Sequence, residues 1–164
     1  MQRILGIDPG LNITGYGLLR RTDQGPKLDE AGVVRGGRGG ELSRRLEKIY
    51  QGVRDVIESY QPSVMAIEEL YSHYQRPRTA ILMGHARGVI CLAAAQYQVP
   101  VYNYAATQVK KLLTGNGRAP KTQMQHSIQR ELSLATLPEP ADIADALAIA
   151  LCHYYLADRK VNVG

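Results

Sequence analysis

Three short apolar runs separated by tight turns occupy the first third of the sequence. They cover Arg3–Asp8, Thr14–Arg20 and Lys27–Arg35, and the first run ends at Pro9-Gly10. Apolar runs of this length that are bounded by turn residues predict β-strands. The connections are too short for a crossover, so neighbouring strands must be antiparallel. We therefore expect an antiparallel meander at the start of a sheet.

The rest of the sequence alternates between helical and strand patterns. Apolar residues recur every three or four positions from Glu41 to Tyr60, just before Pro62, which predicts an amphipathic helix. Further strands are expected at Val64–Ile67 and Val99–Tyr104. Further helices are expected at Thr79–Gln96, from about 105 to 111, at Gln123–Leu132 and at Ala141–Leu156. This order predicts one α/β domain over residues 1–164, with a mixed five-stranded central sheet flanked by helices.

Charge is distributed unevenly along the chain, whose net charge is +5. No Asp or Glu lies between Leu70 and Arg130, although basic residues are frequent there. These are Arg76, Arg78, Arg87, Lys110, Lys111, Arg118, Lys121 and Arg130. Such a segment favours a polyanionic partner such as nucleic acid, and the alternative is a solvated basic face without a ligand.

Two further features bear on location and redox state. No apolar run approaches the roughly 18 to 20 residues that span a bilayer, and Asp8 stands where a signal peptide is apolar. We therefore expect a cytoplasmic protein with no membrane partner. Cys91 and Cys152 lack the spacing of zinc or redox motifs, so we expect two core thiols.

Four carboxylates stand at positions that suit chemistry. Asp8 and Glu68 each end an apolar strand, while Asp142 and Asp145 share one face near the start of the last helix. Taken singly, Asp142 could cap that helix, Asp8 could serve its turn, and Glu68 could pair with an arginine. If the acids converge, hard divalent cations such as two Mg²⁺ ions are needed to offset their charge. Together with the acid-free basic segment, this set favours metal-assisted phosphodiester hydrolysis.

Several motifs, taken in order, resemble the RuvC family of Holliday junction resolvases nearly end to end. The motifs are Gly6-Ile7-Asp8-Pro9-Gly10, Thr14-Gly15-Tyr16-Gly17, Ala66-Ile67-Glu68, Gly84-x-Ala86-Arg87-Gly88, Tyr104-Ala105-Ala106 with Gln108-Val109-Lys110, and Ala141-Asp142-x-Ala144-Asp145 with the apolar run to Ala150. The resemblance implies an RNase H-like fold and a homodimer with two active sites. It also implies paired, symmetric nicks across a four-way DNA junction in recombination and repair, together with the RuvA and RuvB branch-migration complex.

The resemblance also implies roles for individual residues. Asp8, Glu68, Asp142 and Asp145 would be catalytic acids that bind two Mg²⁺ ions, with Mn²⁺ as a substitute. Lys110 and Lys121 would assist at the scissile phosphate or hold the DNA backbone. Tyr71 stands where the family often has a phenylalanine at the junction centre, so it would stack on a base, although a core tyrosine is the alternative. The expected DNA-contacting residues are Tyr71, Arg76, Arg78, Lys110, Lys111, Arg118 and Lys121.

Other interpretations compete with the resolvase. Gly115–Thr122 is similar to a phosphate-binding loop, but Pro120 replaces its second glycine and removes a backbone donor. An RNase H-like nuclease of ribosomal RNA processing shares the early Gly-Ile-Asp motif, and a non-catalytic junction-binding protein would explain the basic segment alone. For the dimer, we expect the small residues Gly84, Ala86 and Gly88 to form part of the seam.

Overall fold

The computed structural model describes residues 2–70 and 76–161, with side chains described through residue 157. Within these residues a five-stranded sheet has the order β3-β2-β1-β4-β5. Its strands are β1 (Arg3–Asp8), β2 (Ile13–Thr22), β3 (Gly25–Arg35), β4 (Val64–Glu68) and β5 (Val101–Tyr104). β2 is antiparallel to β1 and β3, whereas β4 is parallel to both β1 and β5. The predicted meander and mixed sheet are confirmed.

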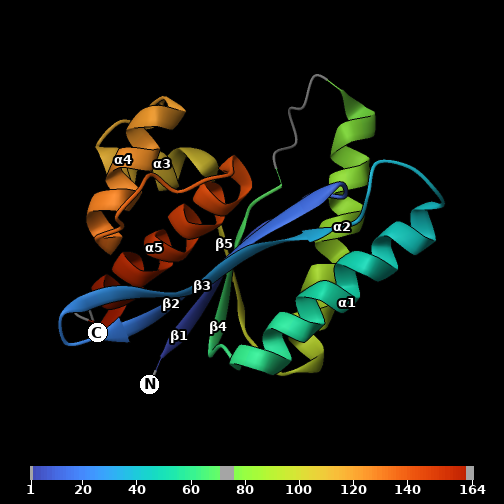
Figure 1. Cartoon of the computed structure of the whole chain (residues 1–164), viewed down its shortest axis with the longest axis horizontal. Helices are drawn as coiled ribbons and strands as arrows, with labels where there is room; N and C mark the ends of the chain where they lie inside the picture. Colours follow the sequence, from blue (N-terminus) through green and yellow to red (C-terminus); the bar gives the residue numbers. More distant parts are fainter. Residues whose placement is uncertain (1, 71–75, 162–164) are drawn as a thin grey trace.

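Helices cover both faces of this sheet (Figure 1). They are α1 (Leu42–Tyr60), α2 (Pro77–Gln96), α3 (Ala106–Thr114), α4 (Lys121–Leu132) and α5 (Ala141–Val161). α1 and α2 lie on one side, and α5 lies on the other with α3 and α4 beyond it. Every predicted helix is present. The ends differ by a few residues, because α4 begins at Lys121 directly after Pro120 and α5 continues past Leu156.

Strand alternation separates two hydrophobic cores. Leu5 and Ile7 of β1 point to the α1 and α2 side, where they pack with Met65 and Ile67 of β4. Ile4 points to the opposite core, which is built around α5. Side chains two residues apart share a face of a strand, so Asp8 lies on the α5 side of the sheet. The same alternation places Val64, Ala66 and Glu68 of β4 on the α5 side.

The remaining sequence expectations concern the bilayer and the thiols. No helix in the described part of the chain is long and apolar enough to cross a membrane. Cys152 is buried in the α5 core and Cys91 is half-buried against the other core, and both are free thiols. The prediction of a core thiol is confirmed for Cys152, whereas Cys91 lies at the margin of its core.

Candidate active site

Two of the predicted acids meet at the carboxyl ends of adjacent parallel strands. Ile7 of β1 is aligned with Ile67 of β4, so Asp8 and Glu68 follow at neighbouring positions. The turn after Asp8 is fixed by Thr14, whose Oγ1 donates to the Gly10 carbonyl at 2.7 Å and accepts from the Gly10 N–H at 3.2 Å. The sheet thus holds both carboxylates at one edge.

The start of α5 brings the other two acids to the same edge. α5 crosses β1 and β2 where these strands present glycines in place of side chains. A Cβ on Gly15 would lie 2.1 Å from the Asp142 carbonyl oxygen, and a Cβ on Gly6 would lie 2.1 Å from the Ala146 carbonyl oxygen. Only glycine permits this approach. Gly6 of β1 and Gly15 and Gly17 of β2 all face α5. The two glycines at alternate positions of β2 were the sequence signal that could have predicted this close contact.

The other three carboxylates all interact electrostatically with Asp8. Burial raises the pKa of Asp8 to about 8, and repulsion from Asp145, Glu68 and Asp142 adds to the increase, while Lys121 opposes it. The pKa of Glu68 is raised by burial and then by Asp145. The pKa of Asp145 is likewise raised by burial and by Asp142, although this residue keeps solvent contact. The site therefore gathers more negative charge than it neutralises.

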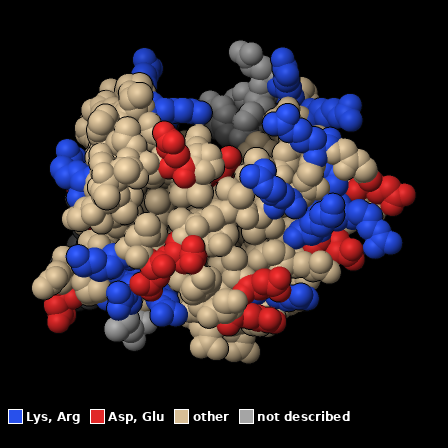
Figure 2. All heavy atoms as spheres, viewed as in Figure 1, with Lys and Arg blue, Asp and Glu red and all other residues tan. Residues whose placement is uncertain are grey.

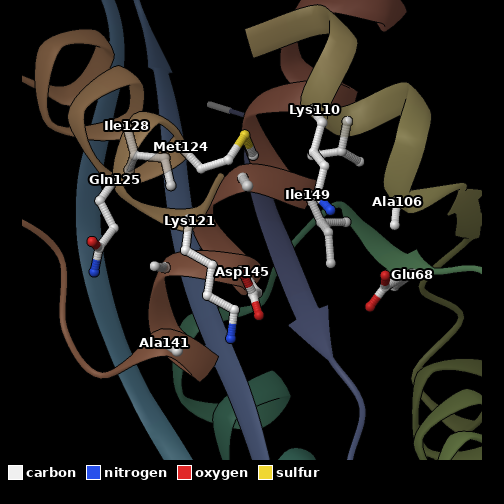
Figure 3. Close-up of a pocket in the computed structure, with 13 residues that line it drawn as sticks. Glu68, Ala106, Lys110, Lys121, Met124, Gln125, Ile128, Ala141, Asp145 and Ile149 are labelled. Carbon is white, nitrogen blue, oxygen red and sulfur yellow. The ribbon is translucent and has the colours of Figure 1, made fainter. Parts of the chain in front are cut away.

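Two lysines partly offset this charge. Lys121, at the start of α4, lowers the pKa of Asp8 and Asp145, while Lys110 of α3 lowers that of Glu68 and Asp145. Both lysines line a pocket with Glu68 and Asp145, and the pocket has a volume of about 170 Å³ (Figure 3). Its inner wall is apolar, with Met124, Ile128 and Ile149 among the lining residues. The lysines are thus placed beside the acids, as the sequence led us to expect.

The donor set suits a hard divalent cation. Carboxylate oxygens are preferred ligands of Mg²⁺, and a cation would relieve the repulsion that raises the pKa of Asp8. Among the residues with described positions, no three His, Cys, Asp or Glu side chains are already drawn into a metal-binding cluster. The residue types fit, and the carboxylates would have to draw together around an ion.

The expected DNA-contacting residues lie on both sides of the acids. Arg76 and Arg78 are exposed at the start of α2, and Lys111 and Arg118 are exposed on α3 and the loop that follows it. Figure 2 shows basic side chains on both sides of the acidic residues near the centre of this face. Tyr71 lies outside the described residues.

Arg87 has an internal role that the sequence did not indicate. Its Nε donates to the Glu68 carbonyl oxygen at 3.3 Å, and its Nη2 donates to Oδ1 of Asn103. Asn103 is the β5 residue aligned with Ile67 of β4. Arg87 therefore ties the end of β4 to β5 from the α2 side. Sequence reasoning counted it among the cations of the basic segment and within a family motif, without assigning it a role.

The prediction for the dimer seam is wrong in one residue. Ala86 is fully buried in the core, whereas Gly84 is half-buried and Gly88 is exposed. Residues two apart on a helix do not share a face, so the three could not line one surface. The outer side of α2 instead presents Ile81 and Leu92, which are 61% and 51% exposed.

Comparisons with known proteins match this chain to one family along nearly its whole length. The family model described as crossover junction endodeoxyribonuclease RuvC matches residues 4–153. The protein of that name from Rhodopirellula baltica is 55% identical over 161 residues, which cover 97% of this chain and 89% of the relative. The one from Desulforamulus reducens is 46% identical over 150 residues, which cover 92% and 91%.

A solved structure of a RuvC protein also has a closely similar backbone. Thermus thermophilus RuvC in complex with a Holliday junction substrate superimposes with a TM-score of 0.91 at 32% identity, covering 98% of this chain and 97% of that chain. This agreement confirms the RNase H-like α/β fold that was expected from the sequence motifs.

Proposed function

Since this chain belongs to the RuvC family of crossover junction endodeoxyribonucleases, we propose that it resolves Holliday junctions in recombination and repair by hydrolysing phosphodiester bonds. The observation that supports this proposal is that Glu68, Asp142 and Asp145 all repel Asp8, beside two lysines that oppose the repulsion among these acids. The nuclease domain extends over residues 1–164, and its location is the cytoplasm.

The four acids would hold two Mg²⁺ ions, with Mn²⁺ as a substitute. When bound, these ions supply charge stabilisation and water activation for phosphodiester hydrolysis. The chain itself positions the ligands, because strand ends fix Asp8 and Glu68 while the glycine-lined contact fixes α5. Lys110 and Lys121 would hold the scissile phosphate and offset negative charge that develops on its oxygens.

The flanking cations would hold the DNA. Arg76 and Arg78 on one side of the acids, and Lys111 and Arg118 on the other, would contact phosphates without reading bases. Tyr71 follows β4 by three residues and would stack on a base opened at the crossover.

Two symmetric nicks call for two active sites, so the working form would be a homodimer. Its seam would use the outer side of α2, where Ile81, Gly84, Gly88 and Leu92 leave an apolar surface. The RuvA and RuvB complex would be the further partner.

The proposal is tested with a synthetic four-way junction, a linear duplex and a structured ribosomal RNA, each incubated with the protein and Mg²⁺. We expect paired nicks at symmetric positions in the junction alone. Preferential cutting of the RNA would instead favour the ribosomal RNA nuclease, and tight junction binding without any nick would favour the non-catalytic binding protein.

A further inference from the structure

A glycine-rich loop with a basic residue at its centre lies at the same edge of the sheet as the acids. Its sequence, Gly36-Gly37-Arg38-Gly39-Gly40, connects β3 to α1. β3 runs in the same direction as β1, because both are antiparallel to β2. The end of β3 at Arg35 is therefore at the same end of the sheet as Asp8, and Figure 1 shows the loop running on from β3 to α1.

This loop is attached to the turn that follows Asp8. The N–H groups of Gly36 and Gly37 donate to the Asn12 carbonyl oxygen at 3.0 and 3.3 Å. Arg45 of α1 donates through Nε to the Gly37 carbonyl oxygen at 3.0 Å and through Nη2 to Oδ1 of Asn12. The loop is thus held in place next to the catalytic edge.

One glycine of the loop has no internal reason to be glycine. Gly37 and Gly40 have φ angles of 84° and 95°, which favour glycine, and a Cβ on Gly36 would lie 2.1 Å from the Leu11 carbonyl oxygen. Gly39 is different, because its φ is outside the left-handed range and an added Cβ would meet nothing within 4 Å. An absent side chain on an open surface leaves the backbone free for close approach by another molecule.

The sequence that flanks the loop is basic. Arg35, Arg38, Arg44 and Lys48 are all exposed, and the acids in the same stretch are Glu41 and Glu47. Arg44 pairs with Glu47 at 3.3 Å, an exposed pair that contributes little to stability. Positive charge therefore exceeds negative charge around an accessible backbone. This stretch lies outside the acid-free segment between Leu70 and Arg130.

We propose that loop 36–40, with Arg35, Arg38 and Lys48, binds the phosphate backbone of the DNA that occupies the acidic site. This inference rests on the proposed nuclease function and adds a surface to it. Asn12 is four positions after Asp8 in the sequence, so their Cα atoms are at most about 14 Å apart. A B-DNA turn rises about 34 Å, so one duplex laid on Asp8 can also reach the loop.

Junction affinity measured at several salt concentrations tests the proposal. Arg38→Ala is expected to reduce the slope of log affinity against log salt by about 0.9, and Arg35→Ala/Arg38→Ala/Lys48→Ala by about 2.7. Lys27→Ala is the matched control, because Lys27 is near the opposite end of β3. Gly39→Val is expected to weaken binding without lowering the melting temperature, since its side chain enters open space.

The outcomes separate this inference from the function on which it rests. An unchanged salt slope in the triple variant, or a loss equal to that of Lys27→Ala, would overturn the loop proposal. A lowered melting temperature in Gly39→Val would show that this glycine serves the fold, and would overturn the proposed role of Gly39 in DNA binding. These comparisons require wild-type protein that binds and nicks the junction, and a wild type that does neither would contradict the proposed function instead.

Discussion

The two faces of the sheet are packed in opposite ways. On the α1 and α2 face, bulky side chains such as Ile57, Met65 and Ile67 fill the space between layers. On the α5 face, Gly6 and Gly15 leave no side chain, and the α5 backbone lies directly against the strands. Both faces bury apolar side chains, but only the α5 face also brings a helix backbone against the strands. This difference indicates that catalytic geometry depends on the α5 face, whereas stability depends on both.

The largest expected effects distinguish the acids at the α5 face from the apolar core on the α1 and α2 face. Asp142→Asn removes a proposed metal ligand, so nicking should fall by more than about 100-fold while junction binding stays intact or tightens. Asp8→Asn, Glu68→Gln and Asp145→Asn should behave alike. Ile57→Ala on the other face should lose about 2 to 5 kcal/mol of unfolding free energy and retain nicking below its melting temperature. Junction nicking and chemical denaturation measure the two effects, and parental nicking by any acid variant would remove that residue from the site.

Gly15→Ala tests whether the close contact between β2 and α5 also positions Asp142. Gly15→Ala places a Cβ only 2.1 Å from the Asp142 carbonyl oxygen, so the start of α5 must shift. Nicking should fall steeply even in preparations whose circular dichroism shows a folded protein. Undiminished nicking by this variant would show that the close contact does not position Asp142.

Much of this contrast was accessible from the sequence. The ends of two apolar runs placed Asp8 and Glu68 at strand ends, and helical spacing placed Asp142 and Asp145 on one face. The internal use of Arg87 could not be foreseen, because its partners are a main-chain carbonyl and Asn103, sixteen residues away. The burial of Ala86 was missed because small residues were grouped by type without regard to helical phase.

A smaller effect is expected at the end of β4. Arg87→Gln should weaken nicking about 10-fold, because the hydrogen bonds that tie β4 to β5 support the position of Glu68. Arg78→Gln, on the same helix, should instead raise the junction dissociation constant through loss of a phosphate contact. Titrations of nicking rate against Mg²⁺ should show a higher half-saturation concentration for Arg87→Gln alone. Equal half-saturation in both variants would mean that Arg87 has no positioning role.

The last expected effect is on thermal stability in metal-free buffer. The pKa of Asp8 is about 8 in the folded protein and near 3.8 in the unfolded chain, so the folded state holds this proton more tightly. Its stabilising contribution is complete below about pH 4 and is lost as the pH rises to about 8. The melting temperature of the wild type should therefore decline over this range relative to Asp8→Asn. Parallel curves for the two proteins would contradict the raised pKa.

The most direct test of the central claim is a carbon-detected NMR titration of the Asp8 carboxyl group, with and without Mg²⁺. If four carboxylates converge to hold divalent cations, the pKa of Asp8 is about 8 without the metal and falls well below that value with it. A pKa that stays near 3.8 under both conditions would show that the acids do not act as one site.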